Sequence, residues 1–245
     1  MSLRDDRRPG GPASRLLEDW SGGPPPLTLA ALAVICLFMA LQVLDPAVLA
    51  ALRRDPAGLA AGQWWRLASP VLVQADGWAQ FAFNFAGIAV VGAAVERRRG
   101  RPFWSLAVLA GLAAGEWAGY RWVPQGAGSS VLVCGLAGGL LAFAWRRDLR
   151  DAWPLEFSFY WLTALAEDAL LGPAGAAAAC IGLALAIGGA RARGAIGPRT
   201  VGAAILVMLA EAVLLCLLAD DHGPPTLAGA TVGLLLLRST GSRPA

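Results

Sequence analysis

Residues 128–145 read GSSVLVCGLAGGLLAFAW, 18 residues without a charged side chain. A helix needs roughly 17–25 mainly apolar residues to cross the hydrocarbon core of a bilayer. Two arginines, Arg146 and Arg147, follow this run, and two serines, Ser129 and Ser130, lie at its start. The segment therefore predicts a membrane helix with a hydroxyl nucleophile at one end and positive charge at the other.

The composition of the whole chain agrees with a membrane protein. Hydrophobic residues make up 57% of the 245 residues and charged residues 15%, whereas soluble domains carry about 25% charged residues. The four cysteines lie inside apolar runs without metal-ligand spacing, which indicates buried small side chains. The chain has no glycine-rich phosphate loop, metal-ligand cluster or basic nucleic-acid patch, so we expect no cofactor, no metal and no nucleic-acid partner.

Hydropathy predicts an all-α, polytopic membrane bundle of six to eight transmembrane helices. Besides the segment 128–145, the candidates are Leu27–Leu44, Trp78–Val95, Phe103–Trp122, Leu155–Leu171, Ala174–Ala190, Thr200–Leu218 and Pro224–Leu237. Leu155–Leu171 is weaker because it contains three acidic residues. If it forms a non-crossing hairpin with Ala174–Ala190, six spans remain, and otherwise there are eight.

The arginine clusters predict the orientation, because cytoplasmic loops carry an excess of positive charge. The clusters are Arg4/Arg7/Arg8/Arg15, Arg97/Arg98/Arg99/Arg101, Arg146/Arg147/Arg150, Arg191/Arg193/Arg199 and Arg238/Arg243. All five fall on the cytoplasmic side with either six or eight spans. We therefore expect a disordered cytoplasmic tail at 1–26, a membrane domain at 27–238 and a short cytoplasmic tail at 239–245, in a bacterial inner (cell) membrane.

This orientation brings several polar residues to the outer face. Ser130 opens a span that runs inward, and His222, the single histidine, opens the last span in the same direction. Gln80 and Asn84 lie in the first turns of the second span, which also enters from outside. A serine and a neutral imidazole on one side of the bilayer can form a nucleophile and base pair.

Two further patterns concern packing. Glycines recur every four residues at Gly111/Gly115/Gly119, Gly135/Gly139 and Gly229/Gly233, which predicts close helix packing in lipid. Glu116 and Glu211 lie inside apolar spans, where we expect them to be neutral or paired and to face the bundle, with Arg121 a candidate partner for Glu116.

Four stretches together resemble the rhomboid family of intramembrane serine proteases. They are Gly62–Leu67 (GQWWRL); Asn84 with Gly92–Arg97 (GAAVER) and Gly100; Gly128–Ser130 (GSS) with Gly135 and Gly138; and His222 with Gly229 and Gly233. The likeness covers roughly residues 45–145 and 199–238. The stretches around 51–67 and 220–233 also resemble the rhombosortase branch, which is associated with processing of C-terminal sorting tails.

The resemblance implies a rhomboid-like fold and a catalytic dyad without a third acid. Ser130 would be the nucleophile and His222 the general base. Asn84 and Gln80 would stabilise the oxyanion as amide donors, helped by the free N–H groups at a helix N-terminus.

The chain departs from the family pattern at several positions. Gln74 and Gln80 correspond to two histidines of the second span, Cys134 to an aromatic residue, and Val131 to a glycine whose replacement could crowd the oxyanion site. The glycine spacing of the last span also fits a register in which Thr226 takes the place of His222. Threonine is no base at neutral pH, so that register predicts an inactive protein.

The sequence therefore predicts an intramembrane serine protease that cleaves single-span or C-terminally anchored membrane proteins near the outer face. The alternative is a catalytically inactive rhomboid-like protein that binds transmembrane helices, and a small-solute transporter is a distant third.

Overall fold

The computed structural model describes residues 23–145 and 153–240, and the regular structure within these ranges is helical, without a β-strand. The predicted tails at 1–26 and 239–245 lie mostly outside the described residues. So do residues 146–152 and the side chain of Arg238, which belong to the predicted arginine clusters.

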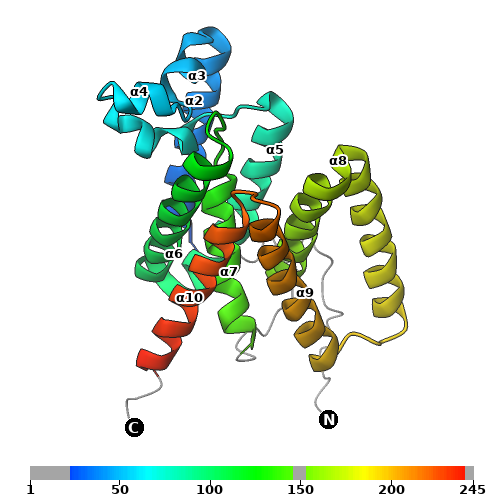
Figure 1. Cartoon of the computed structure of the whole chain (residues 1–245). Helices are drawn as coiled ribbons and strands as arrows, with labels where there is room; N and C mark the ends of the chain where they lie inside the picture. Colours follow the sequence, from blue (N-terminus) through cyan, green and yellow to red (C-terminus); the bar gives the residue numbers. More distant parts are fainter. Residues whose placement is uncertain (1–22, 146–152, 241–245) are drawn as a thin grey trace.

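The helices occur in the following order along the chain (Figure 1). They are α2 (Pro26–Leu44), α3 (Ala47–Leu52), α4 (Pro56–Ala60), the 3₁₀ helices η1 (Trp64–Leu67) and η2 (Ser69–Leu72), α5 (Gly77–Gly87), the π-helical turn η3 (Ile88–Gly92), α6 (Ala93–Trp122), α7 (Ser130–Trp145), α8 (Trp153–Ala192), α9 (Pro198–Leu217) and α10 (Gly223–Thr240).

Two of these helices are each divided by a kink at a glycine. Gly100 in α6 has φ 82° and Gly172 in α8 has φ 74°, a backbone conformation that glycine adopts without steric cost. A proline follows each kink within two residues, as Pro102 and Pro173, and starts the next helical stretch. Every one of the eight predicted apolar segments therefore coincides with a helical stretch, and the predicted all-α membrane bundle is confirmed.

Length and apolar composition make four of the described helical stretches capable of crossing a membrane. They are Pro26–Leu44, Gly77–Trp122, Trp153–Ala192 and Arg199–Leu217. Ser130–Trp145 and Gly223–Leu237 are shorter apolar helices. Gly77–Trp122 and Trp153–Ala192 each contain a kink, at Gly100 and Gly172, and the two halves of α8 form a hairpin beside α9 (Figure 1).

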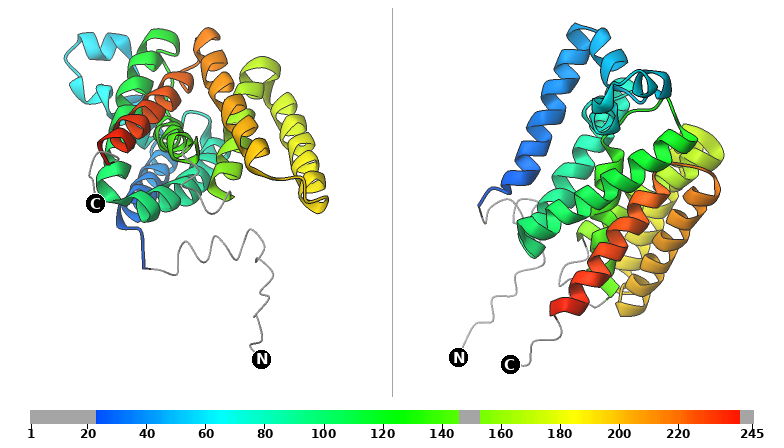
Figure 2. Two further views of the ribbon diagram at one scale, coloured as in Figure 1. Left: turned by 90° about the horizontal axis from the view of Figure 1, so that it is seen from below. Right: turned by 60° about the vertical axis from the view of Figure 1, so that its left-hand side comes forward.

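Helix α7 is the centre of the bundle. Its side chains from Ser130 to Ala144 are all buried, and α6 and α10 pack against it (Figure 2). Glycines permit the close approach. A Cβ placed on Gly229 of α10 would lie 1.9 Å from the carbonyl oxygen of Gly135, and one on Gly111 of α6 would lie 2.8 Å from the Cα of Gly135. The predicted packing role is confirmed for these ridge glycines other than Gly119, which faces the Arg54 side chain.

The short helices α3, α4, η1 and η2 form a compact segment at one end of the bundle (Figure 1). Arg66 holds this segment together, because its Nη1 donates hydrogen bonds to the carbonyl oxygens of Ala50 and Arg53 and its Nε donates to Gln63. Arg66 is buried, and it satisfies carbonyl groups at the end of α3 that have no partner within that helix. The arginine of the sequence motif Gly62–Leu67 is thus a structural residue.

At the start of α2, a carboxylate from another helix takes the place of an N-cap. Buried Glu96 of α6 accepts hydrogen bonds from the backbone nitrogens of Leu27 and Thr28 at 3.0 and 2.8 Å, and from the Thr28 hydroxyl at 2.9 Å. A negative charge at a helix N-terminus also interacts favourably with the helix dipole. Glu96 therefore ties the first helix to the turn between the second and third apolar segments.

Candidate active site

Ser130 is the first residue of α7, and the chain before it is fixed on two sides. The backbone nitrogen of Gly128 donates to the carbonyl oxygen of Pro70 at 3.0 Å. The hydroxyl of Ser129 accepts a hydrogen bond from Nε2 of Gln74 at 3.1 Å. Ser129 is fully buried in this contact, and Ser130 is also buried, with 6% of the residue exposed. Of the two adjacent serines, Ser129 is therefore held by Gln74, and Ser130 is the candidate nucleophile.

His222 supplies the group that faces Ser130. Its Nε2 lies 2.8 Å from Oγ of Ser130, although the two residues are 92 positions apart in the chain. The imidazole sits in the turn between α9 and α10, and its side chain is 18% exposed. The structure thus brings together the two residues predicted as nucleophile and base, at a distance suited to direct proton transfer.

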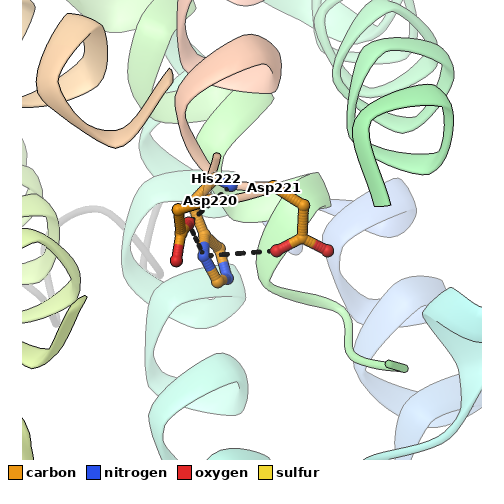
Figure 3. A group of neighbouring side chains, drawn as sticks. All are labelled: Asp220, Asp221 and His222. Carbon is orange, nitrogen blue, oxygen red and sulfur yellow. Dashed lines mark hydrogen bonds and ion pairs between the residues drawn. The ribbon is translucent and has the colours of Figure 1, made fainter. Parts of the chain in front are cut away.

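A carboxylate contacts the other nitrogen of the ring (Figure 3). Oδ1 of Asp220 lies 2.6 Å from Nδ1 of His222 and also accepts the backbone N–H of His222 at 2.9 Å. Asp221 lies on the opposite side of the ring, with its Oδ1 3.5 Å from Nδ1. A carboxylate at Nδ1 favours the tautomer that carries a proton there and leaves the lone pair of Nε2 toward Ser130.

The electrostatic surroundings of His222 favour its protonated form. Burial acts to lower the pKa of the imidazole, but the hydrogen bond to Asp220 and the negative charges of Asp221 and Asp220 outweigh burial and the opposing charge of Arg54. The net effect is a pKa above the usual value. Burial acts to raise the pKa of Asp220, and its hydrogen bonds and charge attraction to His222 outweigh this and hold its pKa below the usual range.

Asp221 belongs to a buried charge cluster next to the site. Its Oδ2 accepts a hydrogen bond from Nη2 of Arg54 at 2.5 Å, and Nη1 of Arg54 lies 3.6 Å from the carboxylate of Glu116 in α6. All three side chains are at least 91% buried, because each is at most 9% exposed. Gly119 and Gly126 leave the space that the guanidinium fills, since a Cβ at either would meet Arg54 within 2.4 Å.

The charge cluster corrects the predicted partner of Glu116 and gives Gly119 a role beside Arg54. The predicted partner of Glu116 was Arg121, but the structure pairs Glu116 with Arg54, which the turn between α3 and α4 carries into the bundle. Gly119 accommodates this arginine and is no part of a helix–helix ridge. Glu211 faces the bundle as expected and accepts a hydrogen bond from Thr163 at 2.7 Å.

The two predicted oxyanion donors, Asn84 and Gln80, each donate to another group of the protein. Nδ2 of buried Asn84 donates to Oε1 of Gln74 at 2.8 Å, and Nε2 of Gln80 donates to the carbonyl oxygen of Ala127 at 3.0 Å. A Cβ on Gly128 would lie 2.6 Å from Nε2 of Gln80 and 3.5 Å from the Ser130 hydroxyl, so Gln80 borders the nucleophile. Each side-chain amide nitrogen carries two hydrogens, and these hydrogen bonds use one of them.

Two side chains that could have disturbed the site, those of Val131 and Thr226, have contacts of their own. Val131 packs on Gly115 of α6, where its Cβ lies 2.6 Å from the position of a Cβ on that glycine, and it is buried there. Thr226 lies one helical turn into α10, fully buried, and its hydroxyl donates to the carbonyl oxygen of His222 at 2.9 Å. The structure presents His222 and not Thr226 to Ser130.

Three of the residues that build the site had no assigned role in the sequence interpretation: Asp220, Arg54 and Ser129. Asp220 was visible as the acidic residue two positions before the histidine, a spacing at which a carboxylate can bind the following backbone N–H. Arg54 gave no such signal, because its partners Asp221 and Glu116 are 167 and 62 positions away.

The side chains in the described part of the chain that come nearest to a metal-ligand set are those of Asp220, Asp221 and His222, with ligand atoms within 4.8 Å of one another. Protein groups already engage all of them: Ser130 contacts Nε2 of the histidine, the histidine contacts Asp220, and Arg54 binds Asp221. We therefore assign these atoms to contacts within the protein.

Parts of the chain are similar to known proteins. A family model described as the Rhomboid domain matches residues 61–162. "Rhomboid protease GluP" of Bacillus subtilis (strain 168) is 38% identical over 87 residues, a segment that is 35% of this chain and 17% of the Bacillus protein. The match to the family model includes Gln80, Asn84 and Ser130 but ends 60 residues before His222.

Proposed function

We propose that this chain, which belongs to the rhomboid family, is an intramembrane serine protease in which Ser130 is the nucleophile and His222 the general base. The observation that carries the proposal is the distance of 2.8 Å between Oγ of Ser130 and Nε2 of His222. Because this contact joins distant parts of the chain, it depends on the packing of α10 against α7.

The chemistry is acyl transfer. Oγ of Ser130 attacks the carbonyl carbon of the scissile peptide bond while its proton moves to Nε2 of His222. The imidazolium then gives this proton to the leaving amine, and the peptide bond breaks. A water molecule, deprotonated by the same imidazole, hydrolyses the acyl-enzyme and frees Ser130.

The oxyanion that forms during attack needs hydrogen-bond donors. The first turn of α7 offers backbone N–H groups that have no partner within the helix, and the helix dipole favours negative charge there. Asn84 and Gln80 are the side-chain donors we propose. Both must rotate or use their second hydrogen, since Gln74 and Ala127 each accept one.

Rhomboid proteases act on membrane proteins within the bilayer, and we propose single-span or C-terminally anchored substrates cleaved near the outer face. The exposed tryptophans Trp64, Trp65 and Trp78 lie in the segment that precedes α5 or at its first turn, and tryptophan is enriched at membrane–water boundaries. Their position agrees with the orientation proposed from the arginine clusters, in which both termini lie in the cytoplasm of a bacterial cell with either six or eight spans. The rhombosortase branch stays a prediction.

One observation favours the alternative, a rhomboid-like protein that binds transmembrane helices without cutting them. Both side-chain amides proposed for the oxyanion already donate to other groups, as they would in a site that no longer reacts. The alternative predicts the same fold and the same Ser130–His222 contact but no covalent chemistry at Ser130.

The two functions can be separated with a fluorophosphonate probe, which reacts with activated serines. We expect purified protein in detergent to be labelled, and Ser130→Ala and His222→Ala to lose the label. Thr226→Ala should keep it, and Ser105→Ala, in the middle of α6, is a matched serine control. A folded wild-type protein that stays unlabelled while a known serine hydrolase is labelled in the same detergent would favour the helix-binding function.

A further inference from the structure

We infer that Asp220 completes a Ser130–His222–Asp220 triad and acts as the positioning residue of His222. The inference rests on the proposed function and goes beyond the dyad that the family resemblance implies. It names the group that fixes which imidazole nitrogen carries the proton and which one faces the serine.

The first argument is the double contact of one carboxylate oxygen. Oδ1 of Asp220 accepts both the ring Nδ1–H at 2.6 Å and the backbone N–H of His222 at 2.9 Å. The second bond ties the carboxylate to the same residue whose ring it orients, so the ring and the acid move together. A hydrogen bond to an ionised acceptor is shorter and stronger than a neutral one, which agrees with 2.6 Å.

The second argument is the backbone that holds Asp220. Helix α9 ends at Leu217, and Ala219, just beyond its C-cap Leu218, has φ 58°. The nitrogens of Ala219 and Asp220 donate to the carbonyl oxygens of Cys216 and Leu215, respectively. These two bonds are the Schellman pattern of a helix end, in which glycine usually takes the left-handed position. A non-glycine residue kept in this conformation indicates that the surrounding turn is firmly determined.

The third argument is that the neighbouring carboxylate, that of Asp221, is paired with an arginine. Asp221 is 3.5 Å from Nδ1, beyond the reach of a good hydrogen bond, while its other oxygen binds Arg54. The charged groups around His222 are Asp220 and Asp221 from its own turn and Arg54 from the α3–α4 turn, with Glu116 of α6 behind Arg54. Cys134 of α7 and Cys216 of α9 are the thiols on the packed helices. Of the two carboxylates, Asp220 is the one within hydrogen-bonding distance of Nδ1, while Asp221 is paired with Arg54.

Because His222 is the only histidine of the chain, nuclear magnetic resonance of ¹⁵N-histidine reports on this ring alone. We expect the wild-type protein in micelles to hold the tautomer with hydrogen on Nδ1 and to titrate above pH 6.5. Asp220→Asn should lower the titration midpoint and reduce this tautomer. Asp220→Ser should do the same while its hydroxyl keeps the bond to the backbone of His222, which separates loss of charge from loss of the turn.

Asp45→Asn is the matched control, because Oδ1 of Asp45 accepts the backbone N–H two residues ahead at 2.9 Å, the same local bond that Asp220 makes. It should leave the His222 spectrum unchanged. In parallel, fluorophosphonate labelling near pH 7 should fall at least about 10-fold in both Asp220 variants, as part of the 10²–10⁴-fold that general-base catalysis contributes. Asp45→Asn should label at the wild-type rate.

The inference is overturned if the tautomer and midpoint of His222 are the same in both Asp220 variants as in the wild type, or if Asp221→Asn changes them more. The spectra need no catalysis. A wild type that is never labelled but shows the Asp220-dependent tautomer would contradict the proposed protease while leaving the positioning role intact.

Discussion

Replacing Gly229 by alanine tests whether the packing of α10 on α7 sets the distance between Ser130 and His222. The added Cβ would lie 1.9 Å from the carbonyl oxygen of Gly135, and ordinary van der Waals contact starts at 3.4 Å. The oxygen belongs to the backbone of a buried helix and cannot rotate away. The two helices must therefore separate by about 1.5 Å, the difference between these distances.

His222 lies seven residues before Gly229, about two turns along the same chain, so a rigid shift of α10 carries the imidazole with it. A hydrogen bond of 2.8 Å would then lengthen toward about 4 Å, beyond hydrogen-bonding distance. A displacement of about 1 Å can cost about 10²-fold in rate, so we expect fluorophosphonate labelling of Gly229→Ala to fall about 10²-fold. Overpacking should also lower the free energy of unfolding by about 1–3 kcal/mol.

The assay compares labelling rates and thermal unfolding of Gly229→Ala with those of Gly202→Ala. Gly202 lies in α9, and a Cβ there would meet no atom within 4 Å, so this control makes the same chemical change without the clash. Gly202→Ala should label at the wild-type rate and be up to about 1 kcal/mol more stable because alanine favours a helix. A folded Gly229→Ala protein that labels as fast as the wild type would show that this helix contact does not set the Ser130–His222 distance.

Three other predictions follow from contacts at the site and at helix ends. The pKa of His222 is raised and a general base must be neutral, so labelling should rise with pH to a half-maximum above pH 6.5. The stability that the charged His222–Asp220 pair contributes is complete below pH 6.5 and should be lost as the pH rises through the same raised pKa. A labelling half-maximum below pH 6.5 would contradict this. Ala219→Gly should raise the free energy of unfolding by about 1 kcal/mol, because φ 58° is unfavourable for alanine, and unchanged or lower stability in a thermal melt would count against the turn. Glu96→Gln should lower stability by about 1–3 kcal/mol, because the amide would turn a donor toward Thr28, and a melt equal to the wild type would argue against this cap of α2.

The parts of the fold that the sequence predicted are those decided locally. Hydropathy located the apolar helices because each must satisfy its backbone hydrogen bonds within itself in lipid. Even Leu155–Leu171, with its three acidic residues, is helical in the structure, as the first half of α8. The short helices between Ala47 and Leu72 were not predicted, since they depend on contacts such as those that Arg66 makes with distant carbonyl groups.

At the candidate active site, too, local sequence features predicted some of the structure, and contacts between distant residues decided the rest. The positive-inside rule placed Ser130 and His222 on one side of the membrane, but not within 2.8 Å of each other, because hydropathy says nothing about which helices are neighbours. The choice between His222 and Thr226 could not be made from glycine spacing, since both registers use Gly229 and Gly233. In the structure Gly138 of α7 leaves room for the carbonyl oxygen of Thr226, which fixes the rotation of α10.

The most direct test of the proposed nucleophile is peptide mass spectrometry of the fluorophosphonate-treated wild-type protein, which distinguishes the two adjacent serines. Ser130 faces His222 while Ser129 is buried against Gln74, so we expect one adduct per chain, on Ser130, and none in His222→Ala. An adduct on Ser129 would contradict Ser130 as the nucleophile, and an adduct on Ser130 that forms equally fast without His222 would contradict His222 as its base.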